Sequence, residues 1–247
     1  MKKLFFLLTC LLSLTAFGQV SSFMYVKVAP ENRAEFERLE TTYWAEIAQK
    51  AIDDGKMLSW GLLREVGISG PPSNYIIINI FKDFESATTA NSIWDPAVIN
   101  MNANDISTDD IKEVLAVHYY QIEEVIQGNS KFSIHNYARP VNLEGFVQEN
   151  INMWKPFIEK NIKEKKTEQV NWGLGTRVYP QGAKSGATVF TRDGFATLAD
   201  AMEALSYKTL PADFQALLKK SKMAEYDPEG FQWRTIYEGI KWVNLSY

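Results

Sequence analysis

Histidine is the side chain best suited to proton transfer near neutral pH, and this sequence contains only two, His118 and His135. His135 alternates with Tyr137 and Arg139 on one face of a predicted strand. His118 shares its own strand face with Tyr120. A histidine beside tyrosine and arginine in a cavity can act as general base or orient a phenolic or carboxylate substrate. A hydrogen-bonded histidine within a sheet is the plainer alternative, and we favour it because the sequence offers no nucleophile or acid partner.

Two asparagines interrupt apolar strands and form a second candidate group. When the two similar parts of the chain are aligned, Asn136 corresponds to Val26, on the strand face that we expect to contact the helices. Asn79 interrupts the apolar run 75–81. An unpaired buried amide costs about 1–3 kcal/mol, so each asparagine needs a partner. We expect that partner to be protein or water, with ligand binding as the alternative.

The tryptophans provide the last candidates. Trp60 and Trp172 occur in the same Trp-Gly-Leu context in two parts of the chain. An aromatic residue repeated at equivalent sites is typical of a core or interface position. The alternative is that both form the wall of a flat apolar pocket for a small apolar or aromatic molecule.

Motifs for metals, nucleotides and common nucleophiles are absent from the sequence. There is no Walker loop, no Gly-x-Ser-x-Gly elbow and no His-Glu-x-x-His, and Gly173-Leu174-Gly175 lacks the third glycine of a dinucleotide loop. Neither histidine has a second ligand at metal-like spacing. We therefore predict no metal and no cofactor.

The chain repeats itself once, which indicates how these candidates are positioned. Trp60-Gly61-Leu62 recurs as Trp172-Gly173-Leu174, and four further residues recur at a constant spacing. Those four are Pro30, Asn32, Phe36 and Trp44, which recur as Pro140, Asn142, Phe146 and Trp154. A single repeat of this length indicates a fused pair of small domains, because solenoids need shorter units in larger number. We place the first domain at 19–127 and the second at 128–247.

Each copy predicts the element order β-α-β-β-α-β, the ferredoxin-like split unit. Alternating and apolar runs predict the strands, and amphipathic spacing after Asn32 and Asn142 predicts the first helix of each copy. Pro156 should kink that helix in the second copy. The second helix should begin near Asp83 in the first copy and near Asp193 in the second. The predicted strands are 23–28, 57–66, 75–81 and 114–125, then 132–138, 169–179, 187–191 and 231–243.

A sheet covered by helices on one face leaves its other face apolar, so two such units should pack sheet to sheet. In this order and duplication the chain resembles the dimeric α/β-barrel superfamily, with its antibiotic-biosynthesis-monooxygenase-like, NIPSNAP-like and EthD-like domains. The resemblance covers nearly all of the chain after residue 18. It implies an α+β fold in which both halves of the barrel come from one chain. Haem-binding relatives use a histidine on a helix or loop, whereas both histidines here fall on predicted strands.

The N-terminal segment 1–18 has the pattern of a signal peptide. Lys2 and Lys3 precede an apolar stretch, and Ala16-Phe17-Gly18 forms a small-x-small cleavage site. We therefore expect an exported protein, periplasmic or extracellular, with no membrane segment after cleavage. A lipoprotein signal at Cys10 is the disfavoured alternative, because Thr9 fits that pattern poorly. Cys10 is the only cysteine, so the cleaved chain would have no disulfide.

The charge balance argues against one class of partner. The chain has 26 basic and 30 acidic residues and a net charge of −4, without a basic stripe. Nucleic-acid binding needs clustered positive charge, so we exclude it.

Three interpretations of function follow from these residues. The one we favour is a binding protein for a small apolar or aromatic molecule. The second is a cofactor-independent monooxygenase-like enzyme for a phenolic or polyketide-like substrate, in which His118 or His135 is the base and Asn136 and Asn79 orient the substrate. The third is a structural or protein-interaction domain without a pocket. The first two require the side chains named above to meet at a cavity.

Overall fold

The computed structural model describes residues 18–67, 73–183, 185–206 and 210–244. The predicted signal peptide, apart from Gly18, lies outside these ranges, and so does most of the predicted turn at 67–72. No helix within the described ranges is both long and apolar enough to cross a membrane.

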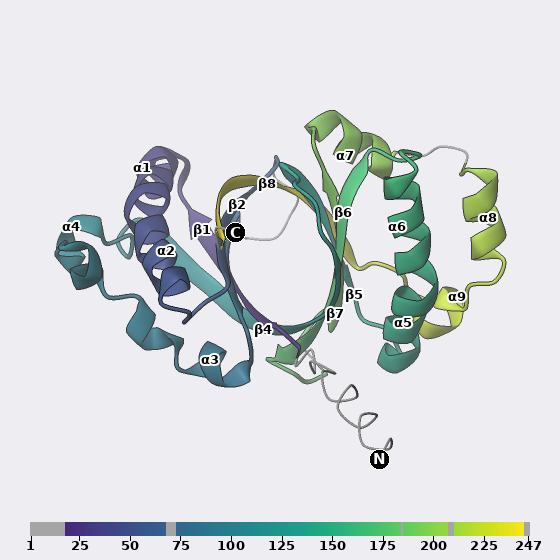
Figure 1. Ribbon diagram of the computed structural model, residues 1–247, viewed down its shortest axis with the longest axis horizontal. Coiled ribbons are helices and arrows are strands. Elements are labelled where there is room, and N and C mark those ends of the chain that lie inside the picture. The colour runs from purple at the N-terminus through teal and green to yellow at the C-terminus, as the bar shows by residue number, and fades with distance from the viewer. Residues whose placement is uncertain (1–17, 68–72, 184, 207–209, 245–247) are drawn as a thin grey trace, which may run out of the picture.

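Eight antiparallel strands close into a barrel, which Figure 1 shows along its axis as a ring. The order around the ring is β1-β3-β2-β8-β5-β7-β6-β4. The strands are β1 (Val20–Val28), β2 (Ser59–Glu65), β3 (Tyr75–Phe81), β4 (Lys112–Ile126), β5 (Phe132–Ala138), β6 (Gln169–Tyr179), β7 (Val189–Phe195) and β8 (Trp233–Asn244).

The strand order confirms the predicted pair of ferredoxin-like units. Strands β4-β1-β3-β2 form one half of the ring and β8-β5-β7-β6 the other. The halves join where β2 pairs with β8 and where β4 pairs with β6. The two sheets are therefore joined by hydrogen bonds along both seams, and their inner faces enclose a single barrel interior.

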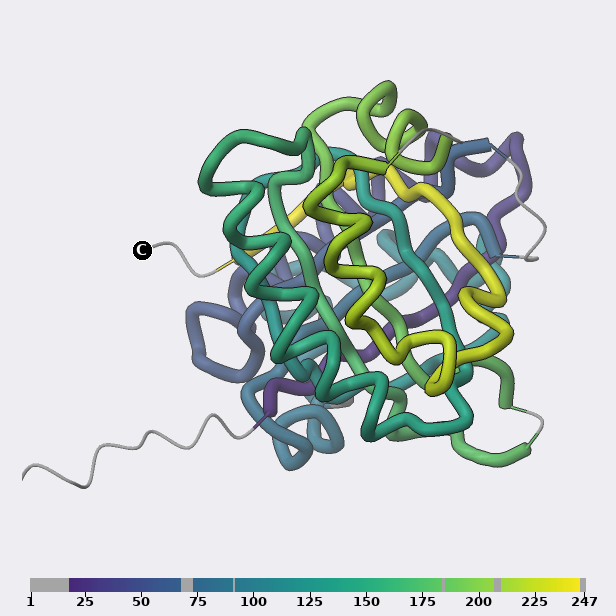
Figure 2. The backbone as a smooth tube through the Cα atoms, turned by 90° about the vertical axis from the view of Figure 1, so that its right-hand side faces the viewer, coloured from purple at the N-terminus to yellow at the C-terminus, as the bar shows by residue number. Residues whose placement is uncertain are grey.

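Helices cover the outside of each half (Figure 1). Those of the first half lie on one side of the ring and those of the second half on the other, and Figure 2 shows the second set crossing its strands. Apolar side chains fill the layer between sheet and helices in each half. The helices are α1 (Arg33–Leu39), α2 (Ala45–Asp53), α3 (Phe84–Thr88), α4 (Ala103–Ile106), α5 (Leu143–Glu149), α6 (Lys155–Lys163), α7 (Leu198–Leu205), α8 (Ala212–Leu218) and α9 (Met223–Tyr226).

A π-helical segment interrupts the first long helix of each copy. It covers Glu40–Trp44 between α1 and α2, and Asn150–Trp154 between α5 and α6. Pro156 follows the second segment, but the first copy has the same irregularity without a proline. Proline is therefore not the cause, and the irregularity belongs to the repeated unit.

The second helix of the second copy begins later than predicted. Asp193 and Gly194 lie within β7, and α7 begins at Leu198 with Thr197 as its N-cap, where Thr197 Oγ1 accepts from the Asp200 amide at 3.1 Å. Within β7, Gly194 allows close packing against the neighbouring strand. A Cβ there would lie 2.1 Å from the Asn171 side chain on β6. The first copy agrees with its prediction, because Asp83 caps α3.

The strand registers correct the alignment of the two copies at β1 and β5. In the first half Trp60 pairs with Asn79 and Tyr25 with Ile76. In the second half Trp172 pairs with Asp193. Phe190, three residues before Asp193, pairs with Tyr137, just as Ile76, three residues before Asn79, pairs with Tyr25. The equivalent pairs are therefore Tyr25 with Tyr137, Phe23 with His135 and Met24 with Asn136. The first copy has two more residues between this tyrosine and the following proline, and β1 carries a register shift there.

Candidate functional site

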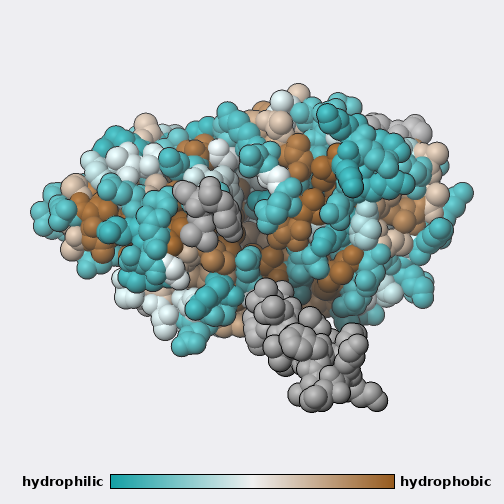
Figure 3. Space-filling view, in the orientation of Figure 1, coloured by the Kyte–Doolittle hydropathy of each residue, from teal (hydrophilic) through white to brown (hydrophobic). Residues whose placement is uncertain are grey.

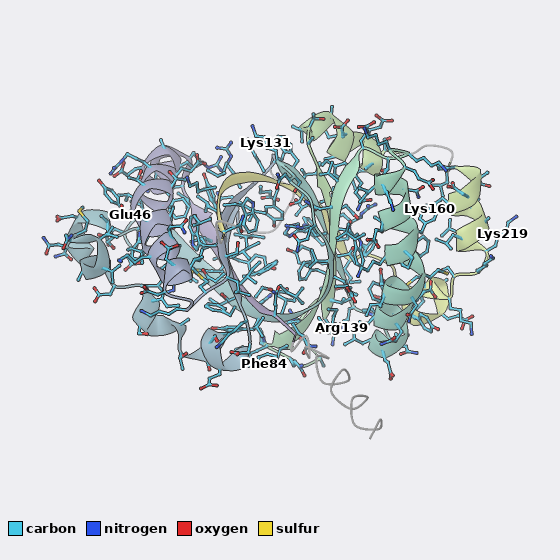
Figure 4. All side chains as sticks on the ribbon, viewed as in Figure 1. Glu46, Phe84, Lys131, Arg139, Lys160 and Lys219 are labelled. Atoms are coloured by element: carbon cyan, nitrogen blue, oxygen red, sulfur yellow. The ribbon has the colours of Figure 1, made fainter. Side chains whose placement is uncertain are left out.

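An aromatic layer fills the middle of the barrel. The rings of Phe23, Tyr120 and Phe190 contact one another, because the Phe23 centroid lies 4.9 and 5.1 Å from the other two and these lie 4.8 Å apart. The His135 ring lies 4.9 Å from the Tyr237 ring. Figure 4 shows side chains projecting into the ring from around its wall. The layer separates two cavities at opposite ends of the barrel.

One cavity, of about 460 Å³, brings one of the predicted histidines together with tyrosines from both halves. We call it the His118 cavity. It lies where β4 and β8 begin and where β6 ends, so both copies contribute to its wall. Its lining includes Tyr25, His118, Tyr120, Tyr137, Arg177 and Tyr237.

The polar atoms of this cavity form one connected group. The Tyr25 hydroxyl lies 3.4 Å from the Tyr120 hydroxyl and donates to the Tyr137 hydroxyl at 3.3 Å. His118 Nδ1 lies 3.3 Å from the Tyr120 hydroxyl, and His135 Nδ1 lies 3.4 Å from the Tyr137 hydroxyl. Each contact is long for a hydrogen bond between such groups, so each is individually weak. Together they leave hydroxyl groups that a bound molecule can contact.

Burial keeps the tyrosines and His118 of this cavity neutral. It raises the pKa of Tyr25 to about 12 and the pKa values of Tyr120 and Tyr137 well above the ordinary range. Burial, and then the Arg177 guanidinium, lowers the pKa of His118 to about 4. Neutral imidazole and neutral phenol each offer a donor and an acceptor. The cavity therefore combines neutral hydrogen-bonding groups with one cation, Arg177, in its wall.

Arg177 and Arg139 hold the loop at the mouth of this cavity. Arg177 Nη2 donates to Ser185 Oγ at 2.8 Å and to the Gly186 carbonyl at 3.2 Å. Arg139 donates to the same carbonyl and to the Gly182 carbonyl, each at 3.2 Å. Figure 4 places Arg139 at the edge of the ring. Arg139 thus shapes the mouth through this loop, and it does not itself line the cavity.

His135 is the more deeply placed of the two histidines. Its side chain has no exposed surface, and its Nε2 has no hydrogen-bond partner among the described residues. Burial, and then Arg192 on the paired strand, lowers its pKa to about 3. His135 therefore belongs to the aromatic layer, whereas His118 is half-buried and faces the cavity.

His135 does not fit the role of a haem ligand. It is enclosed on all sides, whereas a haem ligand needs one imidazole nitrogen that faces an open site able to hold a flat macrocycle. The His118 ring, which lines the cavity, lies 5.0 Å from the Tyr25 ring and 6.2 Å from the Tyr120 ring.

Asn136 lies on the helix-facing side of the sheet, away from the His118 cavity. Its Nδ2 donates to Asp193 Oδ2 at 2.7 Å and to Thr191 Oγ1 at 3.1 Å, and its Oδ1 accepts from Arg234 Nε at 2.7 Å. Protein groups therefore fill its hydrogen-bonding capacity, as the sequence-based expectation favoured. Asp193 is buried, which raises its pKa, and the amide beside it stabilises its charged form.

Asn79 and the two repeated tryptophans also lie outside the barrel interior. Asn79 Nδ2 donates to Ser22 Oγ at 2.9 Å, and its Oδ1 has no partner among the described residues. Trp60 and Trp172 are buried in the apolar layers of the first and second halves. The structure thus brings His118 and Tyr137 together at one cavity and places Asn136, Asn79, Trp60 and Trp172 on the opposite side of the sheet.

Most of the residues that line the cavity were not among the sequence candidates, and they include Tyr25, Tyr120, Tyr237 and Arg177. Tyrosine repeats at two pairs of equivalent positions, because the ladders place Tyr25 with Tyr137 and Tyr120 with Tyr237. Tyrosines repeated in this way could have been predicted as site residues from the sequence. The repetition of Tyr25 as Tyr137 was missed because β1 and β5 were aligned two residues out of register.

Comparison with known proteins supports the fold. No protein-family model matches the sequence, and no curated protein matches it. The structure is similar to that of a candidate monooxygenase from Lactobacillus acidophilus NCFM, with 12% identity and a TM-score of 0.55 over 92% of this chain and 96% of that one. It is similar to an anthrone oxidase-like protein, with 8% identity and a TM-score of 0.57 over 94% of each chain.

A third similar structure is a chlorite dismutase variant from Candidatus Nitrospira defluvii, with 8% identity and a TM-score of 0.51 over 92% of each chain. Because all three similarities cover nearly the whole of both chains, they support the architecture of the complete barrel. At these identities the likeness establishes the dimeric α/β-barrel fold and not an activity.

Proposed function

We propose that the protein binds a small aromatic molecule carrying a hydroxyl group in the His118 cavity. The observation that carries this proposal is the convergence of four tyrosines and His118, from both halves, on one cavity of about 460 Å³. Aromatic walls favour a flat apolar ligand, and neutral hydroxyl and imidazole groups favour a ligand that donates or accepts a hydrogen bond.

The third interpretation, a filled core without a pocket, does not agree with the two cavities of the barrel.

Isothermal titration calorimetry with 2-naphthol and 2-methoxynaphthalene tests this proposal. The cavity should bind 2-naphthol more tightly, because the ether cannot donate a hydrogen bond. Ala187→Phe fills the cavity and should weaken both compounds by about tenfold or more. Ala212→Phe on the exposed start of α8 is the matched control and should change neither. Equal binding by the Ala187→Phe protein would contradict the proposal.

A cofactor-independent oxygenase is the second candidate. The fold neighbours described as a candidate monooxygenase and as anthrone oxidase-like motivate it, together with the contact between His118 and Tyr120 at the cavity. We rank it second because a general base works best when its pKa lies near the working pH, and the pKa of His118 is about 4. Oxygen uptake with a panel of phenols and anthrones tests it. If the unmodified protein consumes oxygen and the His118→Phe protein does not, turnover would replace binding as the proposed function.

Export is the companion proposal. Its support is the signal-like pattern of residues 1–18 and the start of β1 at Val20, directly after the proposed cleavage site. Expression of the full chain in a bacterial host, followed by mass spectrometry of the periplasmic fraction, tests it. A mature chain beginning at Gln19 is expected, and an uncleaved chain in the cytoplasm contradicts it.

A further inference from the structure

The second cavity lies at the other end of the barrel and encloses about 720 Å³. We call it the Arg192 cavity. It lies where β1 and β2 begin and where β4 and β8 end, on the far side of the aromatic layer from His118. Figure 3 shows hydrophobic residues in the middle of the face seen along the barrel axis, within a hydrophilic border. Its apolar lining includes Phe23, Ile78, Ile80, Ile122, Phe190 and Trp242.

Arg192 places a positive charge in a wall that otherwise consists of apolar, amide and hydroxyl side chains. Among the described residues its guanidinium makes one hydrogen bond, from Nη2 to Asn171 Oδ1 at 3.3 Å, and no ion pair. The neighbouring Asp193 points to the other face of the sheet, where it accepts from Asn136 and from Gln169. Protein surrounds the Arg192 side chain, and the surface it keeps faces the cavity. A guanidinium has five donors, so most of its hydrogen-bonding capacity is free.

The surroundings of Arg192 hold it in place. Asn171 Nδ2 donates to the Gly128 carbonyl at 2.7 Å and to Ser130 Oγ at 2.8 Å, which fixes the side chain with its Oδ1 toward Arg192. Burial lowers the pKa of Arg192, which means that the site disfavours an isolated charge. A partly buried cation without a counterion is costly, and an anionic ligand removes that cost.

The duplication shows that the barrel does not require this cation. Ile78 pairs with Gly61 in the first half, and Arg192 pairs with Gly173 in the second, so Ile78 and Arg192 occupy equivalent positions. An isoleucine completes the wall in one half. The arginine in the other half is therefore an addition to the common scaffold.

The two equivalent glycines differ in what covers them. The Trp242 ring lies on Gly61, so that a Cβ on Gly61 would lie 2.6 Å from the Trp242 ring carbons Cε3 and Cζ3. The residue equivalent to Trp242 in the other half is Val125, which pairs with Gly173. A Cβ on Gly173 would meet only the Glu124 carbonyl oxygen, at 3.9 Å. Space that an indole ring fills on one side of the cavity is thus open on the other, directly beside Arg192.

We propose that the Arg192 cavity binds an aromatic carboxylate, with its ring over Gly173 and its carboxylate on the Arg192 guanidinium. The planar fork of arginine matches a carboxylate with two parallel hydrogen bonds. The ring takes the place against Gly173 that Trp242 takes against Gly61. This site is separate from the His118 cavity and takes a charged ligand, where the other takes a neutral one.

Calorimetric titration of the whole protein with 2-naphthoate at pH 7.5 tests this proposal. The acid should bind at least about tenfold more tightly than its methyl ester, which lacks the charge. Arg192→Met keeps much of the side-chain length without the charge and should weaken 2-naphthoate by about tenfold or more while leaving the ester unchanged. Gly173→Leu fills the open space and should weaken both compounds.

Arg38→Met is the matched control, because Arg38 lies on the exposed surface of α1 in an ion pair with Glu35. It should leave 2-naphthoate binding within about twofold. Thermal unfolding of each variant shows whether it is folded. The comparison of acid with ester in the unmodified protein decides the question if a variant does not fold. Equal affinities for acid and ester, or full binding by Arg192→Met or by Gly173→Leu, would overturn the proposal.

Discussion

The two halves of the barrel have the same fold but differ in the side chains on their inner and outer faces. Equivalent positions carry Phe23 and His135, and likewise Ile78 and Arg192, so the first half completes its wall with apolar groups where the second places polar ones. On the outer face Met24 corresponds to Asn136. The tyrosines around the His118 cavity are the exception, because both halves keep them.

This difference indicates which features the scaffold needs and which it merely tolerates. A position that is apolar in one half and polar in the other cannot owe its polar group to the fold, because the same fold forms without it. Positions that agree, such as the tyrosine pairs, serve packing or a site shared by both halves. Of the three predictions below, the first two introduce residues of the first half into the second, and the third makes the same substitution in both halves; they begin with the largest expected effect.

Asn136→Met introduces the residue of the first half and should lower the free energy of unfolding by about 2 kcal/mol, because it removes the amide that joins the partly buried Asp193 carboxylate to the Arg234 guanidinium. Asn79→Met is the comparison. It removes a single hydrogen bond to Ser22 and an acceptor that has no partner among the described residues, so the expected loss is below about 1 kcal/mol. Urea unfolding at pH 7 measures both. Equal losses would mean that the polar cluster around Asn136 has no special role.

His135→Phe introduces the other residue of the first half and should change how stability depends on pH. The pKa of His135 is about 3 in the folded protein, below its ordinary value, so only the unfolded chain takes up a proton as the pH falls below about 6.5. The contribution of neutral His135 is therefore complete above that pH and is lost progressively toward pH 3. Between pH 6.5 and 5 the unmodified protein should lose on the order of 2 kcal/mol that the variant keeps.

Urea unfolding of both proteins at several pH values measures this difference. Taking the difference between the two proteins removes the contribution of His118, whose lowered pKa acts in the same direction. It also removes the contribution of Glu40, whose pKa burial raises to about 7 and which acts in the opposite direction. Parallel pH profiles for the two proteins would contradict the buried, neutral state of His135.

Gly61→Ala and Gly173→Ala test the asymmetry of the Arg192 cavity. The new methyl group at residue 61 would press on the Trp242 ring, so we expect a loss of about 1–2 kcal/mol. The same change at residue 173 enters open space, so its effect should lie within about 0.5 kcal/mol of zero. Thermal unfolding of both variants gives the comparison. A larger loss at residue 173 would show that the space beside Arg192 is closed in solution.

Much of the fold could be predicted from the sequence. Strand alternation, helix periodicity and the recurrence of Trp60-Gly61-Leu62 predicted two ferredoxin-like units, and the closed barrel confirms them. The errors arose at positions where one residue type serves several purposes. A helix was predicted to begin near Asp193, but Asp193 and Gly194 lie within β7, where Gly194 packs closely against Asn171. The proline anchors near β1 and β5 concealed a shift of two residues.

The candidate site was predicted only in part, because side-chain direction depends on which face of a sheet becomes the interior. Alternation placed His135 with Tyr137 and His118 with Tyr120, and the barrel keeps both groupings. It could not show that the face of Asn136 would be closed by Asp193 and Arg234.

By itself the sequence determined the repeated unit and its apolar faces, because periodicity and duplication are local properties of the chain. Only the tertiary structure decided the pairing of β2 with β8 and of β4 with β6, and thereby what the interior contains. That pairing joins residues from distant parts of the chain, divides the interior into two cavities and leaves Gly173 open beside Arg192. No local pattern encodes this, because it depends on how the side chains of two halves fill one shared space.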